Sequence, residues 1–193
     1  MITKNNLVFP LDNFGMWREV CIPYQSTGRR AALFLDRDGT LIELVNYIEK
    51  VEDVRPIPEA ISLIVHAREN NMAVILVTNQ SGIGRGYFDW ETFASVQNKI
   101  NTEVMLGGGK IDAIYACPAL PGSNAMCRKP NPGMLLAGAS DLGIDLSCSW
   151  IVGDTVGDMI AGFRAGVPNG WLVNTGYGLQ DREKALKIRK KRY

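Results

Sequence analysis

Histidine is almost absent from this chain of 193 residues, in which His66 is the only one. A Ser-His-Asp triad, a phosphohistidine intermediate and a multi-histidine zinc site each need an imidazole close to the other catalytic groups. His66 lies inside a helical pattern, far along the chain from every motif described below. The sequence therefore excludes these three kinds of chemistry, and we interpret His66 as a surface or packing residue.

Long apolar segments and a strong net charge are also missing. No apolar run is long enough to span a bilayer, and residues 1–20 carry charges where a signal peptide would have an apolar core. The formal net charge of +1 gives no overall attraction to nucleic acid or to a membrane surface. We therefore expect a cytoplasmic protein without a nucleic-acid or membrane partner. The basic segment 184–193 is interpreted as a solvated helix end, with a contact for an anionic partner as the alternative.

Cysteine is scarce as well. The four cysteines are too few for a disulfide scaffold in a chain of this length. We therefore expect reduced thiols, in agreement with a cytoplasmic location. They are Cys21, Cys117, Cys127 and Cys148, of which only the middle two are close in sequence.

What the chain does contain is a regular alternation of short apolar runs and helical patterns. Alternation of this kind predicts an α/β fold with a doubly wound parallel sheet. Residues 1–30 precede the first apolar run and are expected to form an arm packed on the domain or on a second subunit, so that the domain spans residues 31–193. The runs that predict strands are 31–35, 73–78, 113–116, 150–153 and 171–173. The expected helices begin at or after Pro58, Asp89, Asn131 and Asp154, and Gly143 and Gly166 end the last two.

The most informative segment is Asp36-Arg37-Asp38-Gly39-Thr40, directly after the apolar run 31–35. Open α/β sheets bind ligands beyond the carboxyl ends of their strands, and residues two apart on an extended backbone point the same way. Asp36 and Asp38 can therefore face one substrate, while Gly39 permits a tight turn. Because two neighbouring carboxylates repel each other, the pair implies a cation, and oxygen ligands favour Mg²⁺. Such a pair suits attack on phosphorus, with an ordinary turn as the alternative.

Polar side chains also follow the second expected strand. Thr78 and Asn79 offer a hydroxyl and an amide at the same edge of the sheet, where donors can hold phosphate oxygens. Arg85, in the loop that follows, offers a cation, and a flexible surface loop is the alternative interpretation.

The third and fourth strands are followed by further charged residues. Arg128 and Lys129 come after the third strand, where an ammonium can neutralise both a carboxylate and phosphoryl oxygens. Asp154 closes the fourth strand and either completes a magnesium shell or caps the helix that follows. Asp158 lies one helical turn later and can support Asp154.

In this order, the four segments resemble the four motifs of the haloacid dehalogenase (HAD) superfamily of phosphatases. The resemblance extends from about residue 31 to residue 178. The amino-acid sequences of residues 36–40, 78–86 and 127–134 are similar to those of one branch of this superfamily. That branch contains the D-glycero-D-manno-heptose 1,7-bisphosphate phosphatases and the histidinol-phosphate phosphatases.

The resemblance implies a role for each matching residue. Asp36 would be the nucleophile that forms an aspartyl-phosphate, and Asp38 would protonate the leaving oxygen and then activate water. Thr78 and Lys129 would hold the phosphoryl group. Asp36, the backbone carbonyl of Asp38, and Asp154 would bind Mg²⁺.

The chain departs from this branch at a loop that often binds zinc, with the ligand pattern Cys-x-His and Cys-x-Cys. Cys117 and Cys127 match two of the four ligand positions, but Ala119 and Ala125 occupy the other two. Two thiolates do not close a tetrahedral zinc site, so we expect Mg²⁺ and no structural zinc. No long insert separates the motifs, which predicts an open site without a large cap domain.

The sequence therefore favours a magnesium-dependent phosphomonoesterase, monomeric or a small homo-oligomer, acting on a small sugar or polyol phosphate such as heptose 1,7-bisphosphate. Arg85 and Arg128 are candidates for binding a second phosphate or a carboxylate, because the planar guanidinium suits either group. A phosphatase for a larger substrate, either a nucleic-acid end or a phosphoprotein, is one alternative. A non-catalytic phosphate-binding protein is another, although binding alone does not require the acid/base group of Asp38.

Overall fold

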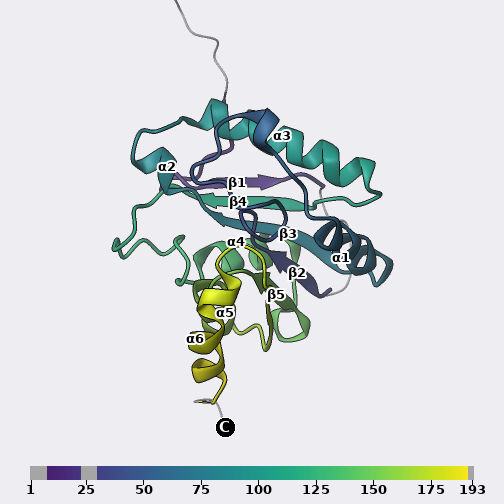
Figure 1. The fold of residues 1–193 in the computed structure, drawn as a ribbon. Coiled ribbons are helices and arrows are strands. Elements are labelled where there is room, and N and C mark those ends of the chain that lie inside the picture. Colours follow the sequence, from purple (N-terminus) through teal and green to yellow (C-terminus); the bar gives the residue numbers. More distant parts are fainter. Residues whose placement is uncertain (1–7, 23–29, 191–193) are drawn as a thin grey trace, which may run out of the picture.

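The computed structural model describes residues 8–22 and 30–190, and the side chains as far as residue 187. Its six-stranded sheet with helices on both faces confirms the expected α/β class (Figure 1). The strands are β1 (Trp17–Val20), β2 (Ala32–Leu35), β3 (Ala73–Asn79), β4 (Ala113–Cys117), β5 (Trp150–Gly153) and β6 (Asn169–Leu172). The helices are α1 (Pro58–Glu69), α2 (Ser81–Gly84), α3 (Trp90–Leu106), α4 (Gly133–Leu142), α5 (Val156–Ala165) and α6 (Gly178–Lys190), with short 3₁₀ turns η1 (Val51–Asp53) and η2 (Leu146–Cys148).

The sheet order places the aspartate-bearing strand at the centre. The strands run in the order β1-β4-β3-β2-β5-β6, and all neighbours are parallel except β1 and β4. Leu35, the last residue of β2, lies opposite Leu76 of β3 and Val152 of β5. The chain winds outward in both directions from β2, so its carboxyl end is the switch point at which open sheets of this kind bind ligands.

Two apolar cores, one on each face of the sheet, hold β2 in place. Leu33 and Leu35 point into the core formed with α1 and α3, and Ala32 and Phe34 point into the core formed with α4 and α5. Successive side chains of a strand point to opposite faces, which explains why β2 reads as a continuous apolar run. The residue that follows β2 is therefore attached to a strand fixed from both sides.

Strand β1 was not expected from the sequence, because residues 1–30 show no clear periodicity. It adds an antiparallel edge strand beside β4, and its Trp17 packs against Trp90 and Phe93. Arg18 of β1 also pairs with Asp141 of α4. The division of the chain into an arm and a domain at residue 30 stays a prediction.

Several helix ends lie where the sequence predicted them. Asp89 caps α3 by accepting a hydrogen bond from the backbone N–H of Thr92, and Gly143 and Gly166 end α4 and α5 in the left-handed conformation. The short helix α2 was not expected. The basic segment falls in α6, whose last described residue is 190, so residues 191–193 lie outside the described part.

No large cap domain is present among the described residues. The connection after β2 contains only η1 before α1 begins, and the connection after β3 contains only α2 before α3 begins. The carboxyl edge of the sheet is therefore uncovered by any second domain in this part of the chain. Within the same residues, no helix combines the length and the apolar character that crossing a membrane requires.

Candidate active site

A cavity of about 320 Å³ lies at the carboxyl edge of the sheet. Its walls bring together residues from all four sequence motifs, which are separated by up to about 120 positions along the chain. Of the predicted site residues, those that line it are Asp36, Asp38, Thr78, Asn79, Arg128, Lys129 and Asp154. Arg85 is not among the lining residues.

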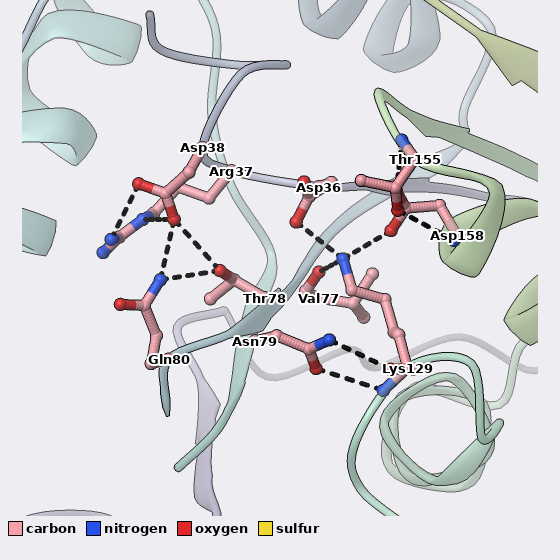
Figure 2. Close-up of polar contacts among 10 residues, drawn as sticks. All are labelled: Asp36, Arg37, Asp38, Val77, Thr78, Asn79, Gln80, Lys129, Thr155 and Asp158. Carbon is pink, nitrogen blue, oxygen red and sulfur yellow. Dashed lines mark hydrogen bonds and ion pairs between the residues drawn. The ribbon is translucent and has the colours of Figure 1, made fainter. Parts of the chain in front are cut away.

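Lys129 forms the centre of the charge network. Its ammonium lies 2.6 Å from a carboxylate oxygen of Asp36 and 2.6 Å from one of Asp158, and it donates a hydrogen bond of 2.6 Å to the backbone carbonyl of Val77 (Figure 2). Burial alone would lower the pKa of Lys129, but the two carboxylates outweigh burial and raise the pKa above its usual value. Lys129 is therefore a fixed positive charge at neutral pH.

Asp36 lies beside Lys129 in an equally buried position. Burial raises its pKa well above the usual value, while the ammonium of Lys129 opposes that rise. Lys129 contacts Oδ1 of Asp36, and no hydrogen bond in the described residues is made to the other oxygen. An oxygen of the carboxylate is thus left for another partner.

Asp154 reaches the site between two close backbone segments. A side chain at Gly39 or at Gly176 would collide with its carboxylate, and both glycines adopt positive φ angles, of 83° and 55°. Oδ2 of Asp154 accepts a hydrogen bond of 2.8 Å from the backbone N–H of Tyr177, whereas Oδ1 is buried without a partner in the described residues. Burial, reinforced by the nearby carboxylate of Asp158, raises the pKa of Asp154 to about 6.

The sequence left open whether Asp154 caps the helix that follows it. Thr155 caps α5 instead, in a capping box with Asp158, whose carboxylate also accepts the backbone N–H of Thr155. Asp154 is therefore free of that structural task. Asp158 has two structural tasks, because it completes the capping box of α5 and also pairs with Lys129.

The acidic residues fit a divalent cation. Asp36, Asp154 and Asp158 each offer a carboxylate oxygen, and these atoms lie within 4.8 Å of one another in a buried position. One ammonium cannot neutralise three carboxylates, and the partnerless Oδ1 of Asp154 is a carboxylate oxygen of the kind that Mg²⁺ prefers. The site can therefore hold a hard cation such as Mg²⁺.

Asp38 faces away from this acidic group. Its carboxylate receives two hydrogen bonds of 3.0 Å from Arg37, one of 2.7 Å from the side-chain amide of Gln80 and one of 3.3 Å from the hydroxyl of Thr78. Figure 2 shows Asp36 turned toward Lys129 and Asp38 turned toward Arg37 and Gln80. Sequence reasoning assigned no role to Arg37 or Gln80, although both lie inside the recognised motifs.

Asn79 is occupied by the backbone of Lys129. Its amide nitrogen donates to the carbonyl of Lys129 and its amide oxygen accepts the N–H of the same residue, both at 3.1 Å. In this arrangement Asn79 fixes the lysine segment to the end of β3. Its predicted contact with substrate stays a prediction.

Arg128 lines the cavity, and Arg85 lies close enough to affect the pKa of Arg128. Arg128 is half-buried and donates to the backbone carbonyl of Ala119, and no ion pair to it is found in the described part of the chain. Burial and the nearby positive charge of Arg85 lower the pKa of Arg128. Tyr47 also lines the cavity and packs edge-on against Tyr87, with ring centroids 4.9 Å apart. This tyrosine pair was not predicted from the sequence.

Two of the four cysteines are not reduced, contrary to expectation. Cys117 and Cys127 form a disulfide with their Cα atoms 5.6 Å apart, so the expectation of reduced thiols is wrong for these two. Cys21 and Cys148 are free. The prediction failed because the loop between the two cysteines, which are ten positions apart in sequence, brings Cys127 back to the end of β4, and spacing alone did not indicate this. While bonded to each other, neither sulfur is available to ligate zinc.

Comparison with known sequences gives matches over most of the chain. A family model described as HAD-hydrolase-like matches residues 126–193. The D-glycero-beta-D-manno-heptose-1,7-bisphosphate 7-phosphatase of Mesorhizobium japonicum is 38% identical over 183 residues, covering 90% of this chain and 83% of that protein. The protein of the same name from Pseudomonas aeruginosa is 38% identical over 158 residues, covering 81% of this chain and 88% of that protein.

Two solved structures also resemble this chain over most of its length. A crystal structure from Mesorhizobium loti, described as a HAD-like phosphatase, has a TM-score of 0.81 at 37% identity and covers 86% of this chain and 83% of its own. The D,D-heptose 1,7-bisphosphate phosphatase of B. bronchiseptica, complexed with magnesium and phosphate, has a TM-score of 0.74 at 33% identity. That match covers 80% of this chain and 86% of the other.

Proposed function

This chain belongs to the haloacid dehalogenase (HAD)-like family of phosphatases, and we propose that it removes the 7-phosphate of a heptose 1,7-bisphosphate with Mg²⁺ as cofactor. The observation that carries the proposal is the position of Lys129, whose ammonium lies 2.6 Å from Asp36 at the carboxyl end of the central strand. The enzyme class, a phosphoric monoester hydrolase, follows from the family itself. The substrate rests on the similarity to named heptose bisphosphate phosphatases and on the charges at the rim.

In the proposed first step, Asp36 is the nucleophile. The oxygen that Lys129 does not engage attacks phosphorus, the bond between phosphorus and the sugar oxygen breaks, and an aspartyl-phosphate forms. Asp38 gives its proton to the departing sugar oxygen. Lys129 and the hydroxyl of Thr78 hold the phosphoryl oxygens, whose charge would otherwise repel the carboxylate.

In the second step, Asp38 takes a proton from water, the water oxygen attacks phosphorus, and the bond to Asp36 breaks to release inorganic phosphate. Asp36, Asp154 and the backbone carbonyl of Asp38 would hold Mg²⁺, which when bound neutralises charge on the phosphoryl group. Phosphate monoesters hydrolyse extremely slowly without catalysis, so this concentration of positioned charge is what the reaction requires.

Arg85 and Arg128 suit a substrate with a second phosphate. Lys129 and the cation account for the transferred group, which leaves Arg128 without a carboxylate partner among the described residues. Burial and the nearby positive charge of Arg85 lower the pKa of Arg128, and a bound dianion would relieve the repulsion between the two cations. A location in the cytoplasm, the absence of a nucleic-acid partner and a monomeric or small homo-oligomeric state remain parts of the proposal.

Removal of divalent cations is expected to abolish activity. After treatment with a chelator, hydrolysis of the bisphosphate should vanish and should return on addition of Mg²⁺, because the buried carboxylates cannot receive a phosphoryl group against their own charge. Elemental analysis of protein purified without chelator should find no stoichiometric zinc. Full activity in excess chelator, or one zinc equivalent held by Cys117 and Cys127, would contradict the assignment.

Replacing Arg128 by alanine is expected to raise KM for the bisphosphate by about tenfold, as loss of a charged hydrogen bond to the second phosphate predicts. Because that phosphate does not react, kcat should change little. The effect on 4-nitrophenyl phosphate, which lacks a second phosphate, should be smaller. Equal losses on both substrates would mean that Arg128 only supports its loop, and a preference for an oligonucleotide or phosphopeptide in competition would argue against a sugar substrate.

A further inference from the structure

We propose that Arg37 is a positioning residue for proton transfer, which fixes the carboxylate of Asp38 beside the phosphoryl-binding hydroxyl of Thr78. This inference rests on the proposed function, in which Asp38 is the acid and base. Its evidence is independent of the nucleophile, because it concerns the contacts of Asp38, Arg37 and Gln80 alone.

The carboxylate of Asp38 is held at both oxygens. The Nε and Nη2 atoms of Arg37 donate one hydrogen bond each, to Oδ2 and Oδ1, both of 3.0 Å. Gln80 adds a bond of 2.7 Å to Oδ2 and a second, of 2.8 Å, to the hydroxyl of Thr78. A two-pronged contact of this kind fixes the plane of a carboxylate as well as its position.

Arg37 is itself immobilised. Only 1% of its side chain is exposed, and its guanidinium lies over the ring of Phe93, 5.3 Å from the ring centre. Phe93 in turn packs against Trp17 and Trp90 at centroid distances of 5.1 and 5.4 Å. The aromatic cluster beneath the site therefore prevents the guanidinium from following Asp38 if the carboxylate moves.

Burying the charged side chain of an arginine in the core carries a desolvation cost. Its Nη1 atom has no hydrogen-bond partner in the described residues, and Asp38 is the acidic group with which it pairs. Replacing a buried charge pair by apolar side chains is often neutral or stabilising, so stability alone does not account for this arrangement. An orienting role for Arg37 accounts for both the pairing and the burial.

The two aspartates thus have separate cations. Lys129 holds Asp36 and Arg37 holds Asp38, and Figure 2 shows the two carboxylates turned in different directions. Asp38 remains within 3.3 Å of Thr78, so it stays at the edge of the phosphoryl site. Without Arg37, the half-buried carboxylate of Asp38 would lose its orientation toward that edge, and proton delivery to the leaving oxygen would fail first.

The test measures how strongly activity depends on the leaving group. Phenyl phosphate and 4-nitrophenyl phosphate have similar shapes, but phenolate needs a proton on departure far more than 4-nitrophenolate does. The measured quantity is kcat/KM, which reports the steps up to transfer of the phosphoryl group to Asp36. For Arg37→Met, kcat/KM is expected to fall by about 100-fold on phenyl phosphate, the usual contribution of a general acid, and far less on 4-nitrophenyl phosphate.

A second readout comes from the same variant. Because Asp38 also activates water, Arg37→Met should release about one equivalent of 4-nitrophenol per site in a rapid burst, followed by slow turnover. Arg37→Lys keeps the charge but not the two-pronged geometry, so its leaving-group dependence should lie between wild type and Arg37→Met. Gln80→Leu should shift the dependence in the same direction by a smaller factor, which provides a test if Arg37→Met does not fold.

Arg68→Met is the matched control, because it also removes an arginine–aspartate pair, with Asp112 at the opposite end of the sheet. It should lose stability without any change in leaving-group dependence. Equal losses on both substrates in Arg37→Met and Gln80→Leu, beside an active wild-type enzyme, would overturn the role of Arg37. An inactive wild-type enzyme on every phosphate ester would instead count against the proposed function.

Discussion

Asp36→Asn is expected to reduce kcat/KM by about 10⁴-fold or more in the presence of Mg²⁺, the size of loss seen when a covalent nucleophile is removed. An amide oxygen is a poor nucleophile and cannot form the aspartyl-phosphate. The substitution also removes the charge that Lys129 and the cation oppose. The first measurement is steady-state hydrolysis of the bisphosphate. The second uses substrate labelled in the transferred phosphate and tests for labelled enzyme after acid quenching, which should be found for wild type only.

The fold of this variant should survive. Asparagine has nearly the shape of aspartate, and Lys129 keeps its second carboxylate partner, Asp158. Asp53→Asn, in the surface turn η1, is a suitable control with unchanged activity. A well-folded Asp36→Asn protein that retains substantial turnover would show that another group attacks phosphorus.

Lys129→Met should lose activity and also about 3–5 kcal/mol of folding free energy, the usual effect of removing one partner from a buried ion pair. Asp36 and Asp158 would then remain buried beside each other without their shared cation. Urea unfolding in the presence of a chelator measures the loss, and wild-type protein under the same conditions is the reference.

The loss of stability in Lys129→Met should depend on pH in a definite direction. Burial already raises the pKa of Asp36, and the ammonium that opposes this rise would be gone. The folded variant would then bind more protons than its unfolded chain, so its stability should fall as pH rises and recover on acidification. A loss of stability that is the same at every pH would mean that Lys129 acts through packing and not through charge.

The positions of the site residues could be predicted because parallel strands end at one edge of the sheet. Asp36 and Asp154 each follow a strand and Thr78 lies at the end of another, and the rule that ligands bind at this edge placed all three around one cavity. The pairing of Lys129 with Asp158 was not predictable in the same way. It depends on the path of a loop and on the first turn of α5, where Asp158 faces inward while also completing the helix cap.

Arg37 illustrates a second limit. A charged residue between two aspartates in sequence is expected to point to solvent, since alternate residues of an extended segment face opposite ways. In the structure that opposite side is the aromatic cluster of Phe93, which lies in a helix that begins more than 50 positions later. The strand β1 was missed for a related reason, because its residues gain regular structure only by pairing with β4.

The uncovered edge of the sheet determines where binding energy can come from. In the proposed complex, a sugar that extends between Lys129 and Arg128 would lie at an edge that no second domain covers among the described residues, so part of its hydration shell would remain. Attraction between the phosphates of the proposed substrate and these two cations would then supply a large part of the binding free energy. Attraction at a partly open rim is screened by dissolved ions, so ionic strength is expected to influence how readily the proposed substrate enters this site.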